Sequence, residues 1–411
     1  MTKEDIVKAA FKVWGRDLYK TTSLNDIALE LGVSKTALYR HFRDKEALLD
    51  AMYITFFDEN AAFLKKTYME AVDFSIEKEA HLFLLKAIAE YYIRNGDAFI
   101  FSLFRVHSSR DRDSLDGEFL KRGIDFRRLV QEKGRSSVYP STMQLLLATL
   151  FCCVADFHHQ RHGLQEPYEE IVSGVLAQIN DRIDKGLNLD AGKIAALDYE
   201  ALEKQVSGTE YDDGDKNTLL GAVAEAVAEA GPWDASMEMV AKKSGLSKSG
   251  LYAHFKSKQD MLAQLFITEF SRMINFAKKQ IETSEIPEAQ LYLAIISIVS
   301  YLRSRPEILV AIDWIKTRDL EFGKGASSQI LRAIKSLKLE AIKNVNPHYL
   351  LEIAQWMLFM IVNTLAWWSQ KPEGPFPGKN IIWAKNAREI PDESFRLLFR
   401  FVALGMEGLN L

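Results

Sequence analysis

Cysteine and net charge are both scarce in this chain of 411 residues. Its only two cysteines, Cys152 and Cys153, are adjacent, which excludes a disulfide framework and suits a reducing compartment. The formal net charge is only −4, so any contact with nucleic acid must come from local basic patches and not from a global field. Hydrophobic residues make up 48% of the chain, which is ample for several cores.

Long apolar runs are also missing. The most hydrophobic stretch, residues 349–368, is interrupted by Glu352, Gln355 and Asn363. Its cleanest part, residues 356–368, is shorter than the ~20 residues that a bilayer requires. We therefore expect a buried helix there and no membrane partner. The first eleven residues are charged and amphipathic, with no secretory signal, so a cytoplasmic location is expected.

The chain also lacks the motifs of common enzymes. It has no nucleophile elbow, no phosphate-binding loop and no paired-cysteine metal motif, and Gly323-Lys324-Gly325 is too short to cradle a nucleotide. Acid–base pairs such as Asp313 and Arg318 fit ordinary pairs on a helix surface. We therefore predict that the protein is not an enzyme and has no cofactor.

A short basic segment occurs twice. Residues 32–45, GVSKTALYRHFRDK, return 213 positions later as residues 245–258, GLSKSGLYAHFKSK, with eight of fourteen residues identical. In each copy a glycine permits a sharp reversal, and a serine, Ser34 or Ser247, can cap the helix that follows. Two helices joined by such a turn form a helix-turn-helix, whose second helix enters the major groove of duplex DNA.

The residue pattern gives the second helix an inner and an outer face. Leu38 and Phe42, four positions apart, share the inner face, so the basic and hydroxyl side chains between them must point outward. The alternative is a solvated basic face without a partner, but such a face seldom repeats its charges, cap and aromatic anchors together. For His41 and His254, a place in the core is the alternative to a contact with DNA.

The repeated segment and its flanks resemble the amino-terminal domain of the tetracycline-repressor (TetR) family. The family pattern falls on Thr22, Ser23, Ile27, Ala28, residues 32–34, Tyr39, His41, Phe42 and Lys45. The second copy departs from the pattern mildly at Ala235, Val240 and Leu246, and more seriously at Gly250. The resemblance implies an all-α fold of two TetR-like subunits in tandem. Each would have a three-helix helix-turn-helix domain and a helical bundle, and the two would pack as an intramolecular pseudo-dimer.

The resemblance also assigns roles in binding double-stranded DNA. The residues expected to contact phosphates are Tyr39, His41, Lys45, Tyr252, His254 and Lys258. Those expected to read base edges are Lys35, Thr36, Arg40, Lys248 and Ser249, and the DNA-binding set also includes Thr22, Ser34 and Ser247. A guanidinium can bond guanine in two places, whereas cationic and hydroxyl groups at helix ends position a protein on the backbone.

The two copies are not equivalent as readers of DNA. Arg40 corresponds to Ala253, so we predict an asymmetric or imperfectly palindromic operator whose Arg40 half is read more sharply. The alternative is that only the first half binds DNA and the second serves pairing and sensing. Gly250 and Ala253 favour that alternative, because the glycine weakens the helix and the alanine removes a base reader.

Helix-forming segments follow each basic unit for about 150 residues. The predicted domains are a first helix-turn-helix domain at 1–48, a first ligand-binding and dimerisation domain at 49–187, an acidic linker at 188–214, a second helix-turn-helix domain at 215–261 and a second ligand-binding and dimerisation domain at 262–411. The last two helical segments of each half are unusually apolar. We therefore expect the halves to cover each other within one chain, although a higher oligomer remains open.

By resemblance, a small molecule bound inside the bundle would release the protein from DNA and make it a repressor. An apolar or aromatic effector is favoured, and the candidate lining residues are Phe101, Phe104, Phe151, Trp314, Trp356 and Trp367. Aromatic residues at helical spacing are more often plain core, and this alternative stays open.

One polar cluster suggests a weak metal site. Asp156, His159 and His162 are spaced three apart and share one helix face. The polar end of an interface helix explains the same residues equally well, so no metal is expected.

Overall fold

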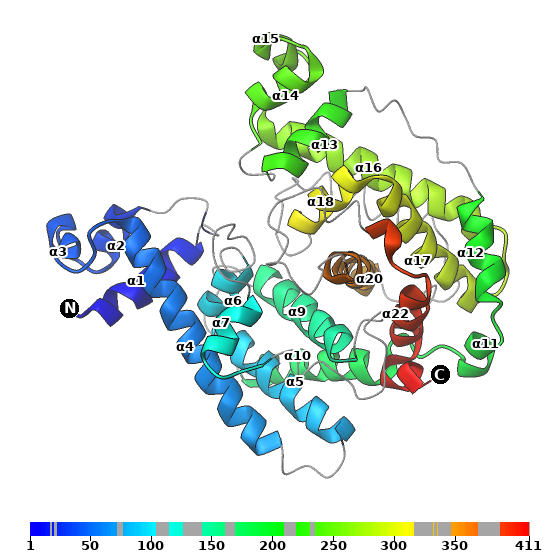
Figure 1. Ribbon diagram of the computed structural model, residues 1–411, viewed down its shortest axis with the longest axis horizontal. Helices are drawn as coiled ribbons and strands as arrows, with labels where there is room; N and C mark the ends of the chain where they lie inside the picture. The colour runs from blue at the N-terminus through cyan, green and yellow to red at the C-terminus, as the bar shows by residue number, and fades with distance from the viewer. Residues whose placement is uncertain are drawn as a thin grey trace. The chain divides into compact units, whose positions relative to one another are not determined.

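Helices are the only regular elements in the described part of the computed structural model (Figure 1). The described residues are 1–16, 19, 23–71, 77–103, 115–125, 142–160, 169–208, 219–230, 235–315, 332, 335, 347–368 and 387–410. No strand occurs among them, which confirms the predicted all-α class. The chain divides into two compact units. The first contains Met1–Glu132 and Cys153–Asn180, and the second contains Lys133–Cys152 and Asp181–Leu411.

The first unit begins with three short helices and continues into longer ones. Its helices are α1 (Lys3–Arg16), α2 (Leu24–Glu30), α3 (Lys35–Tyr39), α4 (Lys45–Ala71), α5 (Glu77–Arg94), α6 (Gly96–Phe101) and α7 (Leu115–Lys121), with parts of α9 (Thr142–Gln160) and α10 (Glu169–Lys185). Helix α1 packs against α2, α4 and α6, and α4 packs along α5. The three short helices therefore rest on the bundle through α1, which contacts both α4 and α6.

The second unit repeats this plan after two additional helices. Its elements are α11 (Ala191–Ala195), α12 (Tyr199–Ser207), α13 (Leu219–Ala230), α14 (Met237–Ser244), α15 (Lys248–Tyr252), α16 (Lys258–Ile281), α17 (Pro287–Ser304), α18 (Pro306–Ile315), α20 (Pro347–Trp368), η3 (Ala387–Glu389), α22 (Glu393–Leu404) and η4 (Gly405–Asn410). Helices α13 to α18 follow the order of α1 to α6, and α20 and α22 take the places of α9 and α10. The helix order agrees with the predicted tandem duplication.

Local sequence signals explain where many of these helices begin. The hydroxyls of Ser23, Ser236 and Ser257 accept bonds from backbone amides in the first turns of α2, α14 and α16. Helices α17 and α18 begin at Pro287 and Pro306, because proline lacks the amide hydrogen that the first turn leaves unpaired. No described helix is long and apolar enough to cross a membrane.

The described part of the acidic segment after α10 is folded against the second unit. It forms α11 and α12, separated at residues 196–198. Arg396 of α22 donates two bonds, of 2.7 and 2.6 Å, to the carboxylate of Glu203, which also accepts a bond from Tyr292 of α17. Gln205 donates to the side chains of Gln280 on α16 and of Thr283 just after it. Helix α12 is thus fixed to three helices of the bundle.

Helices of the two sequence halves meet inside the second unit, which includes residues 142–152 of α9 and 181–185 of α10. The indole of Trp356 on α20 donates a hydrogen bond of 3.1 Å to Thr149 on α9, and both side chains are fully buried. Arg182 on α10 pairs with Glu352 on α20 at 3.2 Å. Helices from the two sequence halves therefore touch through a buried hydrogen bond and an ion pair.

Two glycines allow the ends of α10 and α22 to approach closely. Gly186 and Gly405 have φ angles of +57° and +63°, in the left-handed region. A Cβ on Gly186 would lie 2.4 Å from the carbonyl oxygen of Val402, and one on Gly405 would lie 2.4 Å from the carbonyl carbon of Asp184. The amides of Leu187 and Leu189 then bond to the carbonyls of Val402 and Ala403, at 2.8 and 3.1 Å. This contact is backbone against backbone.

Candidate nucleic-acid interface

The first helix-turn-helix is built around a tight turn between α2 and α3. Gly32 has a φ of +64°, which L side chains rarely adopt, and reverses the chain. Ser34 then accepts a bond of 3.2 Å from the amide of Ala37 and so begins α3. Leu38 and Phe42 are buried as expected, but α3 ends at Tyr39, so Phe42 follows the helix. Trp14 fixes α1 to this pair by donating to the carbonyl of Ser23 at 3.2 Å.

The outer face of α3 carries the predicted DNA-binding side chains. Exposed residues on it and just beyond it are Ser34, Lys35, Thr36, Tyr39, Arg40 and Lys45. Tyr39 exposes 45% of its surface, which is unusual for an aromatic side chain that has a buried core beside it. His41 is half-buried, and Thr22 lies outside the described residues.

The second helix-turn-helix has the same geometry. Gly245 has a φ of +72° and ends α14, and Ser247 accepts a bond of 3.0 Å from the amide of Gly250. Leu251 and Phe255 are buried beneath α15. Ser247, Lys248, Ser249, Tyr252 and His254 are exposed, and Lys258 is half-buried. Tyr252 exposes 52% of its surface, close to the value for Tyr39. Each copy thus presents the same short, serine-capped helix to solvent.

Ion pairs join the first two helices of each copy, with the signs reversed. In the first copy Lys12 and Arg16 on α1 pair with Glu30 on α2, each at 2.9 Å. The bond from Lys12 is the main cause of the lowered pKa of the Glu30 carboxyl group, and the bond from Arg16 lowers this pKa further.

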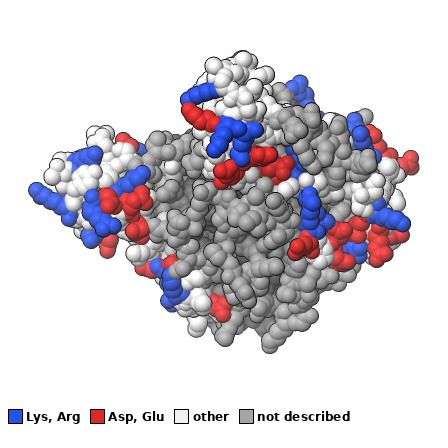
Figure 2. Space-filling view, turned by 45° about the horizontal axis from the view of Figure 1, so that its top comes forward, with Lys and Arg blue, Asp and Glu red and all other residues white. Residues whose placement is uncertain are grey.

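In the second copy Glu225 and Glu229 on α13 pair with Lys243 on α14, at 3.6 and 2.9 Å. The bond to Glu229 is the main cause of the raised pKa of Lys243. Basic and acidic side chains accordingly lie next to each other on both lobes that carry the short helices (Figure 2).

Each helix-turn-helix rests on the sixth helix of its own half. In the first unit, Phe101 at the end of α6 is fully buried and meets the rings of Phe11, Tyr19 and Tyr53 edge-on, with centroids 4.9 to 5.6 Å apart. In the second unit, α18 packs along α13. A displacement of α6 or α18 would therefore act directly on α1 or α13, the first helix of each helix-turn-helix domain.

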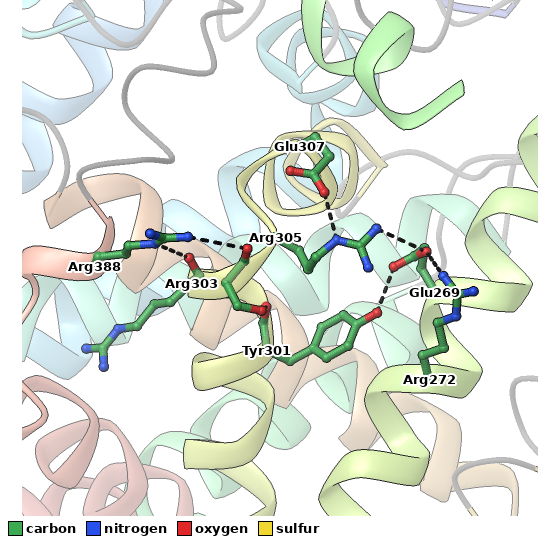
Figure 3. A network of polar contacts seen from close by, with 8 residues as sticks. Glu269, Arg272, Tyr301, Arg303, Arg305, Glu307 and Arg388 are labelled. Carbon is green, nitrogen blue, oxygen red and sulfur yellow. Dashed lines mark hydrogen bonds and ion pairs between the residues drawn. The ribbon is translucent and has the colours of Figure 1, made fainter. Parts of the chain in front are cut away.

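A buried polar network holds the bend between α17 and α18 (Figure 3). Glu269 of α16, only 3% exposed, accepts a bond of 2.7 Å from the hydroxyl of Tyr301 and pairs with Arg272 and Arg305 at 2.9 and 3.4 Å. Arg305 also pairs with Glu307 at 2.7 Å. Burial, reinforced by the charge of Glu269, raises the pKa of Tyr301 well above its usual range.

Sequence reasoning missed this network. Glu269 is 32 residues from Tyr301 and 36 from Arg305 along the chain. The corresponding place in the first half holds Phe56 instead of Glu269. A glutamate within an otherwise apolar helix face was the signal available.

The candidate effector residues are only partly described. Phe101 is packed among rings and Trp356 is buried against Thr149, while Phe151 is half-buried on α9. Phe104 and the side chains of Trp314 and Trp367 lie outside the described residues. The packing of Phe101 and Trp356 is that of ordinary core.

The candidate metal residues are likewise incomplete. Asp156 is half-buried, and the neighbouring His158 directs Nε2 at the carbonyl of Tyr92 at 2.8 Å. His162 and the side chain of His159 lie outside the described residues. Within the residues that are described, no three histidine, cysteine, aspartate or glutamate side chains form a metal-binding group.

The helix-turn-helix copies match a known protein family. The family of bacterial regulatory proteins named tetR matches residues 6–52 and again residues 219–265. The HTH-type transcriptional regulator YerO of Bacillus subtilis (strain 168) is 43% identical over 47 residues, which cover 11% of this chain and 16% of that protein. The fatty acid metabolism regulator protein of the same strain is 27% identical over 77 residues, covering 19% and 40%. The chain thus spans less than half the length of either relative.

One solved structure is also similar. The TetR family transcriptional regulator PfmR from Thermus thermophilus aligns over 96% of its own chain and 45% of this one, at 18% identity. Its TM-score of 0.28 is too low to establish a shared fold. The two matches to the family instead coincide with the two turns, caps and exposed helices described above. The chain therefore carries, twice in tandem, the helix-turn-helix domain of the bacterial regulatory proteins named tetR.

Proposed function

We propose that the protein is a transcriptional regulator that binds double-stranded DNA through α3 and α15. The observation that carries this proposal is the repeated helix of five residues, capped by serine and preceded by a glycine of positive φ, with its basic and hydroxyl side chains in solvent. A recognition helix needs this exposure to enter the major groove.

The exposed side chains divide into two groups by their chemistry. Tyr39 and Lys45, and in the second copy Tyr252, lie where hydroxyl and ammonium groups can bond phosphate oxygens and set the protein's position on the duplex. Lys35 and Arg40 lie on the outer face of α3 or at its end and are proposed to reach base edges. The second copy offers alanine where the first offers Arg40. The operator is accordingly proposed to be asymmetric or an imperfect palindrome.

The two reading helices are proposed to act together as an intramolecular pseudo-dimer. The contacts of Trp356 with Thr149 and of Arg182 with Glu352 support pairing of the two bundles within one chain. For both helices to read one duplex from the same side, they must sit about 34–36 Å apart or a multiple of that distance. A tether raises the local concentration of the second reader once the first has bound.

A small-molecule effector is proposed to release the protein from DNA, which would make it a repressor. The two matches to the family support this, and so does the packing of α1 on α6 and of α13 on α18. An effector that moves either of these helices would change the separation of α3 and α15. Catalysis has no part in the proposal, since regulators of this family are generally not enzymes.

A second candidate is a regulator in which only the first half binds DNA. Gly250 within α15 and Ala253 at its end favour this version, because they lower helix propensity and remove a base reader.

Selection of bound sequences from a random duplex pool tests both versions. Two working readers should select a site of two unlike halves with a helical-turn spacing, and one working reader should select a single short half-site. Paired variants give an independent answer. Tyr39→Ala/Lys45→Ala and Tyr252→Ala/Lys258→Ala should both weaken binding if both halves engage, and only the first pair should matter if one half does. No selected sequence and no effect of either pair would refute DNA binding.

A further inference from the structure

The reading helix of the second copy carries a lysine that already forms an ion pair within the protein. Lys248, the first residue of α15, pairs with Glu238 in the first turn of α14. Both side chains are exposed, at 54% and 64%. The bond to Lys248 is the main cause of the lowered pKa of Glu238, and the same bond raises the pKa of Lys248. Both groups are therefore charged at neutral pH.

The corresponding lysine of the first copy has no such partner. Lys35 occupies the same position on α3, and the residue that matches Glu238 is Asn25. The ammonium group of Lys35 lies 5.8 Å from the centre of the Tyr39 ring and pairs with no carboxylate among the described residues. Its charge is available to an anion arriving from solvent.

The side chains around the second reading helix are also less positively charged than those around the first. The matched segment of the first copy, residues 6–52, holds eight lysines and arginines against six acidic residues, whereas residues 219–265 hold five against five. The charge on the first helix is also reversed, since α1 carries Lys12 and Arg16 where α13 carries Glu225 and Glu229.

These differences bear on affinity for the DNA backbone. A lysine at the start of a reading helix can reach a flanking phosphate as well as a base edge, because lysine is long and flexible. Each cation that neutralises a phosphate releases counterions, which adds about 0.9 to the slope of log affinity against log salt. A lysine held by a carboxylate must give up that partner before it can contribute, and the carboxylate itself repels phosphate. As an exposed ion pair, Glu238 and Lys248 add little to stability, so the main physical effect of the pair is on charged ligands.

We propose that Glu238, by forming an ion pair with Lys248, lowers the affinity of α15 for the DNA backbone. As a result, α3 binds DNA first and α15 binds afterwards. This inference rests on the proposed function, because it requires both copies to meet duplex DNA. The tether makes such an order workable, because a weak second reader still binds once the first holds it nearby. A weak second reader also releases the protein more readily.

The experiment measures binding of the full chain to a labelled mixed-sequence duplex of about 30 base pairs, roughly three helical turns. Fluorescence anisotropy is recorded from about 50 to 200 mM salt, the range over which phosphate contacts change affinity steeply. The central comparison is Lys35→Ala against Lys248→Ala. The first substitution should weaken binding several-fold and flatten the salt slope by about 0.9, and the second should change either quantity little.

Removing the carboxylate should reverse this pattern. Glu238→Gln should tighten binding several-fold and steepen the slope by about 0.9, and adding Lys248→Ala should remove most of that gain. The matched change in the first copy, Asn25→Glu, should weaken binding. All of these positions are exposed, so circular dichroism spectra and melting temperatures should stay at wild-type values.

Two outcomes would overturn the inference and are distinguishable from each other. If Lys248→Ala costs as much as Lys35→Ala and Glu238→Gln changes nothing, the role of Glu238 is wrong while DNA binding stands. If none of the lysine variants alters binding, and Tyr39→Ala/Lys45→Ala also has no effect, the proposed function itself is wrong.

Discussion

Thr149→Val is the most direct test of the contact between helices of the two sequence halves. The substitution keeps the shape of the side chain and removes the hydroxyl that accepts the indole N–H of Trp356 at 3.1 Å. Both residues are fully buried, so no water replaces the lost acceptor. The indole N–H is left without a partner inside the second unit.

The size of the effect follows from that unpaired donor. Leaving a buried polar group unsatisfied costs about 1–3 kcal/mol. Because every 1.4 kcal/mol is a factor of ten, the helices in contact should open about 5- to 150-fold more often. The bond that Thr149 donates to the carbonyl of Leu145 adds little, since it runs within one helix.

Hydrogen exchange followed by mass spectrometry is the suitable assay, because a chain of two compact units need not unfold in one step. Peptides from α20 should exchange faster in Thr149→Val, although they lie some 200 residues away in sequence. Thr67→Val is the matched control. Thr67 is also buried in a helix and bonds the carbonyl four residues earlier, at 3.0 Å, but it belongs to α4 of the first unit.

The reasoning would be refuted by faster exchange confined to α9. It would equally be refuted if Thr67→Val accelerated exchange in α20 as much as Thr149→Val does. Either result would mean that Trp356 does not depend on Thr149 for its hydrogen bond.

Three further outcomes follow from the contacts described. Gly405→Ala should destabilise the second unit by about 2 kcal/mol or more in calorimetry, whereas Gly174→Ala, on an open helix face, should stabilise by about 0.5–1 kcal/mol. Arg396→Ala should cost about 1–2 kcal/mol and speed hydrogen exchange in α12, because it removes both guanidinium bonds to Glu203; unchanged exchange there would contradict the contact. Asp97 is exposed, but partial desolvation by its neighbours still raises the pKa of its carboxyl group despite nearby cations, so the folded state binds its proton slightly more tightly and this small stability is lost as pH rises through the folded pKa. Asp97→Asn should therefore raise the melting temperature slightly at neutral pH and leave it unchanged in acid, and an equal shift at both would contradict the desolvation argument.

Much of the fold is local enough to be predicted from the sequence. Ser34 and Ser247 cap their helices, and Pro306 begins one, because each of these features depends on a few neighbouring residues. Because the segment is repeated, the second helix-turn-helix could be predicted from the sequence despite Gly250. Even the early end of α3 leaves Phe42 buried, so the inner and outer faces were assigned correctly.

The missed features all depend on which side chains meet in space. Nothing in the sequence around Glu238 shows that it faces Lys248, and Glu269 becomes a partner of Arg305 only when α16 and α17 pack. The sequence predicted residues 188–214 as an acidic linker, but acidic composition does not show which cations those side chains meet. In the structure Glu203 forms an ion pair with Arg396, and no local sequence pattern predicts that pair.

The opposite polarity of the ion pairs within the two helix-turn-helix copies has a consequence for folding. A chain that contains the same small domain twice risks building one domain from helices of both copies, a common failure of repeat proteins. If α1 packed on α14, Lys12 and Arg16 would face Lys243, and if α13 packed on α2, two glutamates would face Glu30. Both wrong combinations repel and both native ones attract. The duplicated chain thus carries in its charges a means of matching each helix to its own copy as it folds.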